Sequence, residues 1–311
     1  MRNAASPLPS TDNRPRLAEC RAMLAERLYG KQDVIDAALV CLLAGGHLLI
    51  EDVPGVGKTT LATGLADVLG LDFGRIQFTS DLLPGDILGL SIHDPARAGF
   101  VFRPGPIFHS LVMADEINRA NPRTQSAMLE AMAEGRVTVD GETRALAQPF
   151  HVIATQNPAD QTGTFVLPDS QMDRFLMCIS IGYPPPEAER RLLAGALPER
   201  GVSTSAAAID LAACQDDVRE VRLAPPLLDY LLALLAASRD TSLFVAGLSP
   251  RAGIALRRAA QAQAWLAGRD HVRPADVQAV LGPVVDHRLV LAPAHTDKRP
   301  SEVLLAHVAL T

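Results

Sequence analysis

The sequence is poor in aromatic residues, in cysteines and in positive charge. Aromatic residues make up 4% of the chain and the formal net charge is −6. This balance argues against a protein whose main task is to neutralise nucleic-acid phosphates, so we do not expect nucleic acid as a partner. The cysteines show no C-x-x-C spacing, and we expect free thiols in a reducing cytoplasm. They are Cys20, Cys41, Cys178 and Cys214.

Long apolar runs are also missing. Asp36, Gly45 and Gly46 interrupt the most apolar segment, and no other run reaches the roughly 18 residues that cross a bilayer. Residues 1–16 lack the apolar core of a secretory signal, and we expect a disordered tail there. The eight histidines show no metal-ligand spacing such as H-E-x-x-H. We therefore expect a soluble protein without a membrane span or a bound transition metal.

A glycine-rich turn stands between a strand and a helix in HLLIEDVPGVGKTT, from His47 to Thr60. Such a turn is typical of a phosphate-binding loop, because Gly55 and Gly57 let backbone N–H groups turn inward around an anion. Lys58 can reach the outer phosphates, and the Thr59 hydroxyl can bind Mg²⁺. The sequence therefore predicts a phosphate loop, which we define as residues 52–59.

The first position of this loop departs from the usual pattern. The pattern is G-x-x-x-x-G-K-[ST], and Asp52 stands where the first glycine is expected. Aspartate tolerates tight turns and left-handed backbone better than most residues, so we expect the loop to close. The alternative is a glycine-rich turn with a chance Lys-Thr, and the strand before it and the helix after it disfavour that reading.

Two adjacent acids end a second apolar run, LVMADE, from Leu111 to Glu116. In a parallel sheet, ligands bind beyond the carboxyl ends of the strands, so this end is expected beside the phosphate loop. Asp115 can hold Mg²⁺ through water, and Glu116 can take a proton from the water that attacks the γ-phosphate. The alternative is a solvated strand end with two ordinary acids. We call these two residues the acid pair.

Asn157 follows a third apolar strand, Phe150 to Ala154. Its amide is positioned to orient the attacking water, and an Asn-Pro turn explains it equally well, so both readings stay open. Two hairpins are expected, one over Ser91 to Phe108 and one around Asp140-Gly141, a strong turn signal.

The chain changes character after a proline-dense joint, Gly182 to Pro186. Beyond it the spacing predicts helices with Leu and Ala faces and few strands. We expect a structural role for His287 and Arg288, which lie in an apolar stretch. The predicted fold is an α/β parallel sheet sandwiched by helices, followed by a smaller all-α lid. The predicted helices are Glu187 to Leu197, Pro225 to Ser238, Arg251 to Ala267 and Pro274 to Leu281.

Seven blocks occur in an order and spacing that resemble MoxR-type AAA+ ATPases: HLLIEDVPGVGKTT, LVMADEINRA, TQSAMLEAM, GRVTVDGE, VIATQNP, LPDSQMDRFLM and SPRA. The resemblance covers nearly the whole chain from about Leu17 onward. It implies an AAA+ ATP-binding domain over residues 17–183 and a helical lid over residues 187–311. It also implies that the two hairpins are those of the subgroup that holds magnesium-chelatase motor subunits.

The same resemblance assigns roles to the site residues. Asp115 and Glu116 resemble the Walker B acids, and Asn157 resembles sensor 1. Gly30, with its neighbours, resembles the segment that borders the adenine, although a plain turn between helices explains it equally well. The residues resembling the Walker A motif, which would bind ATP and Mg²⁺, are Pro54, Gly55, Val56, Gly57, Lys58, Thr59 and Thr60.

Two arginines complete the predicted site. Arg174 resembles an arginine finger that acts on the nucleotide of a neighbouring subunit, and its planar, permanently charged head suits a phosphate. The alternative for Arg174 is an internal ion pair with Asp173 or Asp169. Arg251 resembles sensor 2. It stands in the first turn of a predicted helix, where the helix dipole disfavours a cation, and a nearby anion would explain that placement.

The resemblance implies an ATPase that assembles as a homo-oligomer, expected to be a hexameric ring, and acts as a chaperone on a client protein. It further implies a partner with a von Willebrand A domain and a client that is an enzyme receiving a metal or cofactor. Three alternatives remain open: a magnesium-chelatase-like motor subunit, a nucleic-acid-dependent AAA+ ATPase, and a monomeric P-loop kinase.

Overall fold

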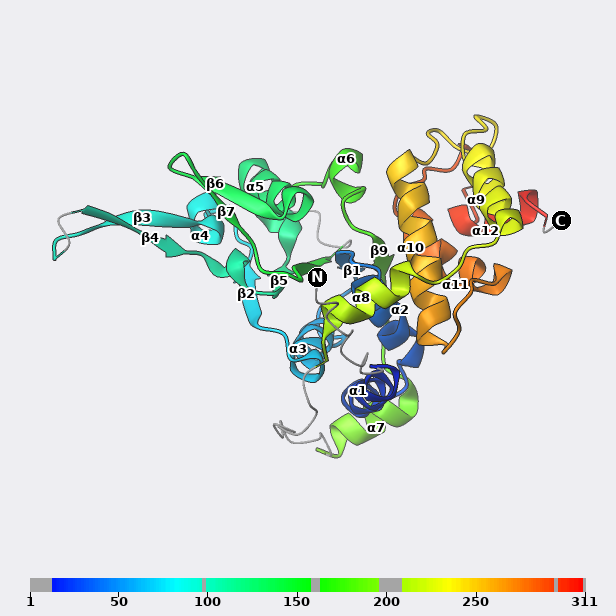
Figure 1. Ribbon diagram of the computed structural model, residues 1–311, viewed down its shortest axis with the longest axis horizontal. Helices are drawn as coiled ribbons and strands as arrows, with labels where there is room; N and C mark the ends of the chain where they lie inside the picture. Colours follow the sequence, from blue (N-terminus) through cyan, green and yellow to red (C-terminus); the bar gives the residue numbers. More distant parts are fainter. Residues whose placement is uncertain (1–12, 97–98, 158–162, 196–208, 294–295, 310–311) are drawn as a thin grey trace, which may run out of the picture.

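The computed structural model describes residues 13–96, 99–157, 163–195, 209–293 and 296–309. These residues form a parallel sheet with helices on both faces, two β-hairpins and a group of C-terminal helices (Figure 1). The fold class predicted from the sequence is confirmed. Of the predicted tail, residues 1–12 lie outside the described part of the chain, and the first helix begins at Arg14.

The central sheet has the strand order β2-β5-β8-β1-β9, and each neighbouring pair is parallel. Leu48 and Ile50 face one hydrophobic cluster, and Leu49 between them faces the other. Because both faces are buried, the inner strands β1, β5 and β8 are mainly apolar, whereas Arg75 and Gln77 alternate with buried residues on the edge strand β2. The strands are β1 (Leu48–Glu51), β2 (Phe73–Gln77), β5 (Leu111–Asp115), β8 (His151–Gln156) and β9 (Met177–Ile179).

Helices cover the two faces of this sheet. The helices α1 (Arg14–Arg27), α2 (Gln32–Leu43) and α3 (Lys58–Leu69) contribute to the first cluster, and α5 (Pro122–Glu134) contributes to the second. The start of α5 is set locally, because the Asn121 side chain accepts hydrogen bonds from the first-turn N–H groups.

Both predicted hairpins are present. The hairpin of β3 (Gly89–Asp94) and β4 (Gly99–Pro104) projects away from the sheet (Figure 1). It is flanked by α4 (Pro84–Leu88) and the short helix η1 (Pro106–Phe108). The second hairpin pairs β6 (Arg136–Val139) with β7 (Glu142–Ala145). The Arg144 guanidinium lies 4.0 Å from the centre of the Phe102 ring, and this cation–π contact joins the two hairpins.

The C-terminal part is helical, as predicted. Helices α8 and α10 pack against α2, and α11 packs against β9. Two short helices, α8 (Leu211–Arg219) and α12 (Pro300–His307), were not predicted; they span nine and eight residues, and helices this short depend on tertiary packing for their stability. No described helix is both long and apolar enough to cross a membrane. The remaining helices are η2 (Ile117–Arg119), α6 (Asp169–Met172), α7 (Pro186–Leu193), α8 (Leu211–Arg219), α9 (Pro225–Ala237), α10 (Pro250–Leu266), α11 (Pro274–Val285) and α12 (Pro300–His307).

A buried pair of histidines lies at the amino ends of β1 and β8. His47 Nδ1 accepts a hydrogen bond of 3.0 Å from the Val152 N–H, so its proton is on Nε2, which donates to the Met132 carbonyl at 3.2 Å. Burial, together with a smaller effect of nearby His151, lowers the pKa of His47 to about 3. The ring is therefore neutral across the physiological range.

His151 is held in the same neutral form. Its Nδ1 donates to the Gly46 carbonyl at 2.8 Å, and its Nε2 accepts from the Gln215 amide of α8 at 3.0 Å. Burial lowers the pKa of His151 to about 4. His287, after α11, is also buried, and burial lowers its pKa to about 3. Protonation of any of the three rings in the folded chain therefore costs free energy.

We expect stability to fall as the pH drops from about 6.5 toward 4. The unfolded chain protonates these histidines near pH 6.5 and the folded chain does not, so their contribution is complete above that pH and is lost below it. Each histidine contributes a slope of about 1.4 kcal/mol per pH unit. The free energy of unfolding, measured in urea between pH 7.5 and 4.5, should depend less steeply on pH in His151→Gln than in the wild type. The exposed His93, changed to Gln, is the control, and an equal slope in both variants contradicts the assignment.

Candidate functional site

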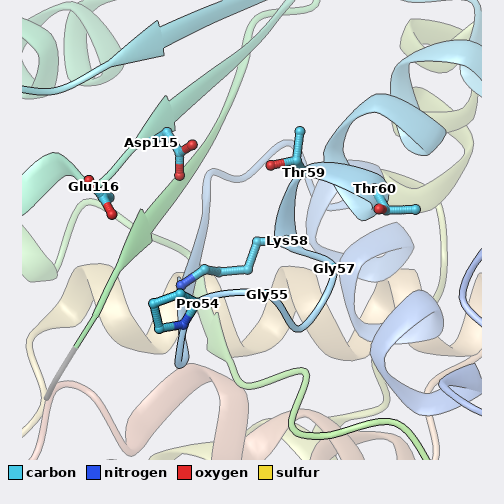
Figure 2. A pocket seen from close by; sticks show the side chains of 8 residues that line it. All are labelled: Pro54, Gly55, Gly57, Lys58, Thr59, Thr60, Asp115 and Glu116. Carbon is cyan, nitrogen blue, oxygen red and sulfur yellow. The ribbon is translucent and has the colours of Figure 1, made fainter. Parts of the chain in front are cut away.

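A cavity of about 340 Å³ opens at the carboxyl ends of the strands (Figure 2). The phosphate loop and the start of α3 form one wall, and the end of β5 forms the other. The sequence predicted every residue that lines it. They are Pro54, Gly55, Gly57, Lys58, Thr59, Thr60, Asp115 and Glu116.

The loop has the backbone that an anion cradle requires. Gly55 has φ 85° and Gly57 has φ 103°, a left-handed region that other residues adopt only with strain. A side chain at either position would meet no other atom within 4 Å, so glycine is needed here for its backbone freedom and not for space. Helix α3 begins at Lys58, and its unpaired first-turn N–H groups and dipole favour an anion in the cavity.

The Lys58 side chain lies back across the loop toward Pro54 (Figure 2). Its Nζ donates to the Asp52 backbone carbonyl at 2.6 Å. Burial lowers the pKa of Lys58, and the negative charges of Asp52, Asp115 and Glu116 oppose that fall. The Lys58 ammonium can therefore exchange its present acceptor, the Asp52 carbonyl, for a phosphate oxygen.

Asp115 is the last residue of β5 and is 9% exposed. Its carboxylate accepts hydrogen bonds from the Thr155 hydroxyl at 2.7 Å and from Arg75 at 2.6 Å. Figure 2 shows the Thr59 hydroxyl pointing toward this carboxylate from the opposite wall. A hydroxyl and a carboxylate facing one another are oxygen ligands of the kind that Mg²⁺ binds.

Glu116 stands in a strained backbone conformation, with φ 57° and ψ 49°. A residue other than glycine pays about 1–2 kcal/mol there, and such strain often marks a functional site. The Thr155 hydroxyl accepts from the Glu116 N–H at 2.9 Å. The Glu116 carboxylate lies 3.1 Å from both the Gln77 amide and the Arg119 Nε. Local hydrogen bonds therefore aim this carboxylate into the cavity.

Several predicted site residues do not line the cavity. Asn157 follows β8, which lies between β5 and β1 in the sheet, so it stands at the same edge as the acid pair. Val56 belongs to the loop but not to the lining. Gly30 stands in the turn before α2, with φ 75°. Arg174 and Arg251 are also outside the lining.

Arg174 follows α6 and is half-buried. Its Nη1 donates to the Leu129 carbonyl of α5, and its Nε, among the described residues, has no hydrogen-bond partner. The neighbouring Asp173 pairs with Arg288 instead, at 2.8 Å. The Arg174 guanidinium is thus held within its own chain, with Nε buried and, in that described part, unpaired.

Arg251 is exposed in the first turn of α10. The N-cap is Ser249, whose Oγ accepts from the Ala252 N–H and donates to the Asp173 carboxylate, both at 3.1 Å. Arg288, whose side chain is 5% exposed, binds the same carboxylate. The half-buried carboxylate of Asp173, beside Arg174, therefore also anchors the helix that carries Arg251, and Arg288 has the structural role expected from the sequence.

Three residues of the site were given no role from the sequence: Arg75, Gln77 and Thr155, the last expected only as a polar group at the strand end facing the nucleotide. Arg75 and Gln77 alternate on β2, and both point to the acid pair across the strand pairing. Thr155 is fully buried in an otherwise apolar strand. A polar residue in such a strand was the available signal, because a buried hydroxyl needs a partner.

Two family models match the chain. A model described as the ATPase family associated with various cellular activities (AAA) matches residues 47–177. A model described as the AAA lid domain matches residues 236–306. The two matches follow the order of the sheet and the C-terminal helices.

Curated relatives and a solved structure match over most of their lengths. YeaC of Bacillus subtilis is 44% identical, over 91% of this chain and 89% of that protein. The chaperone MoxR1 of Mycobacterium tuberculosis is 39% identical, over 91% and 78%. The protein MoxR of Paracoccus denitrificans is 32% identical, over 94% of both chains. A crystal structure of a candidate ATPase from Cytophaga hutchinsonii has a TM-score of 0.86 and 33% identity, over 96% of both chains.

We expect Thr155→Val to destabilise the chain by about 1–3 kcal/mol. Valine has the same shape and suits a strand, but it removes the donor to Asp115 and leaves the Glu116 N–H unpaired. Thr155→Ser keeps the hydroxyl and is the matched control. The measurement is the urea unfolding midpoint at pH 7. Equal midpoints for the two variants would show that the hydroxyl does not hold the acid pair.

Proposed function

We propose that this chain, which belongs to the MoxR-type AAA ATPase family, hydrolyses ATP in the cavity between the phosphate loop and the acid pair. The observation that carries the proposal is the meeting of three chemistries in one cavity. The same space is lined by a loop whose glycines have left-handed backbone, by the Lys58 ammonium and by two adjacent carboxylates. Together they suit a triphosphate, its counter-cation and the removal of a proton from water.

Mg²⁺ fits this cavity, because Thr59 and Asp115 offer oxygen ligands from opposite walls. We propose that these two residues hold it, Asp115 through water. When bound, Mg²⁺ neutralises charge on the phosphate oxygens. The residues from Pro54 to Thr60, together with Gly30 beside the base, bind the nucleotide. Lys58 leaves the Asp52 carbonyl to donate to the outer phosphates.

The proposed base is Glu116, which takes a proton from the attacking water onto a carboxylate oxygen. Gln77 and Arg119 hold that carboxylate, and Thr155 holds its backbone. Asn157 stands at the end of the neighbouring strand and orients the water. A base that is already held in place lowers the activation barrier, because no entropy has to be lost to orient it during the reaction.

We further propose that the chain assembles as a homo-oligomeric ring, a hexamer, in which Arg174 reaches the nucleotide of the neighbouring copy. The planar, permanently charged head of Arg174 supports this, and its guanidinium must leave the Leu129 carbonyl and its buried position to make that contact. Arg251 acts as a second phosphate contact. We propose an ATP-binding domain over residues 17–183 and a lid over residues 187–311.

We propose that the ring works in the cytoplasm as a chaperone, since a relative 39% identical to this chain is named a chaperone. The partner we propose carries a von Willebrand A domain, and the client is an enzyme that receives a metal or cofactor. Trapping experiments with an ATP-bound, hydrolysis-deficient variant would identify both.

We expect Glu116→Gln to bind ATP with near-normal affinity and to hydrolyse it about 10²–10⁴ times more slowly, because the amide cannot accept the proton. Phosphate release and equilibrium binding of a fluorescent ATP analogue measure the two quantities. The control is Glu134→Gln, which removes an exposed carboxylate on α5. Normal turnover in Glu116→Gln would refute the role of the base and, with it, the proposed mechanism.

Arg174→Ala should abolish turnover in a way that a second inactive variant can rescue. In a mixture with Glu116→Gln, some interfaces join an intact Glu116 to an intact Arg174 from the next copy. An equimolar mixture should recover about a quarter of the wild-type rate, the share of complete interfaces in randomly mixed rings. Arg222→Ala, an exposed ion-paired arginine of the C-terminal part, is the control. A mixture no more active than its components would place Arg174 outside the neighbour's site.

A further inference from the structure

Every polar group of Asp52 has a partner. Its N–H donates to the Gln156 carbonyl at 3.2 Å, and its own carbonyl accepts from Lys58 at 2.6 Å. The side-chain Oδ1 accepts from the Val53 N–H at 2.8 Å. With 8% of its surface exposed, Asp52 is part of the interior. The departure from glycine at this position therefore places a buried carboxylate at the start of the phosphate loop.

The second carboxylate oxygen of Asp52 binds the segment that follows β9. It accepts from the Ser180 hydroxyl at 2.8 Å, from the Ile181 N–H at 2.7 Å and from the Gly182 N–H at 2.6 Å. Burial, the largest influence, would raise the pKa of Asp52, but the hydrogen bonds from Gly182, Ser180, Val53 and Ile181 together lower it. The group is thus a carboxylate at neutral pH, and glycine at this position offers none of these bonds.

Lys31 binds the other edge of the same segment. Its Nζ donates to the Ile181 carbonyl at 2.6 Å and to the Tyr183 carbonyl at 2.7 Å. The residue before it, Gly30, lies against Pro185, where a Cβ would come within 2.6 Å of the proline ring. In the peptide group that joins Ile181 to Gly182, the N–H therefore binds the Asp52 carboxylate and the carbonyl binds the Lys31 ammonium.

We call residues 180–185 the linker segment. It is the covalent connection from β9 to α7 and to all the C-terminal helices. It runs between the phosphate loop and the Gly30 turn, the two places where the proposed function puts the phosphates and the base of ATP. The linker segment contacts both of these places. Its contacts can therefore differ in strength between the nucleotide-bound and the nucleotide-free chain.

We infer that Asp52 and Lys31 are positioning residues that clamp the linker segment to the nucleotide site, so that nucleotide binding and the placement of the C-terminal helices are coupled. The route runs through Lys58, because a phosphate that takes its Nζ removes a donor from the residue that holds the linker segment. Coupling is reciprocal, so the clamp also sets the affinity for nucleotide. This inference rests on the proposed function in taking ATP or ADP as the ligand.

Hydrogen exchange of the intact chain tests the clamp without requiring turnover. Asp52→Gly restores the usual loop pattern, and in the absence of nucleotide it should speed exchange of the Ile181 and Gly182 amides about tenfold. Asp52→Asn keeps one acceptor oxygen and should give an intermediate rate. Asp67→Asn, an acid on α3 that pairs with Arg27, should leave these amides unchanged. Equal exchange in Asp52→Gly and the wild type overturns the clamp.

ADP is the probe for the coupling. It should slow exchange of the linker segment about tenfold in the wild type and leave it unchanged in Asp52→Gly and in Lys31→Met. The dissociation constant for ADP should rise about fivefold or more in both variants. Lys31 makes its contacts on the far side of the linker segment, so its effect would not arise from damage to the loop.

The two proposals fail in different ways. ADP binding with full protection of the linker segment in both variants overturns the inference and leaves the ATPase proposal standing. No ADP binding by the wild-type chain overturns both.

Discussion

The parallel pairing of the strands is the constraint on which the rest of the structure depends. Because every strand runs the same way, the carboxyl ends of β1, β5, β8 and β9 meet at one edge. Asp52, the acid pair, Asn157 and Ser180 follow these strands and are brought together there although 128 residues separate the first from the last. Both faces of such a sheet must be buried, and the helices on either side cover them.

Charge at this edge is balanced across the sheet. Lys58 and Arg75 approach the acid pair from the loop and from β2, and buried hydrogen bonds from Thr155 fix the Asp115 side chain and the Glu116 backbone. Charged groups this close together interact strongly, so small displacements change the electrostatic energy between them. A triphosphate and Mg²⁺ would enter a site whose donors and acceptors are already oriented, which is the condition for electrostatic catalysis.

Two carboxylates, the half-buried Asp173 and the buried Asp52, join the sheet to the C-terminal helices. Asp173 binds Arg288 and the N-cap of α10, beside the two arginines predicted to meet phosphate. Asp52 binds the linker segment from the phosphate loop. Loss of Asp173 would leave the Arg288 side chain, which is 5% exposed, without its charged partner, and loss of Asp52 would leave the Ile181 and Gly182 N–H groups without an acceptor, so both connections resist loosening. The C-terminal helices are therefore placed by polar contacts as well as by the shared apolar core.

Local pattern alone determined the strand, turn and helix around Lys58, the apolar strand ending in Asp115 and Glu116, and the Asp-Gly hairpin, because each depends on neighbouring residues. The three-residue strand β9 and the short helices α8 and α12 were set by packing against other elements. Only the tertiary structure decided that Arg75 binds Asp115 and that Asp52 binds residues 180–182. Those contacts depend on strand order and through-space distance, which no local periodicity encodes.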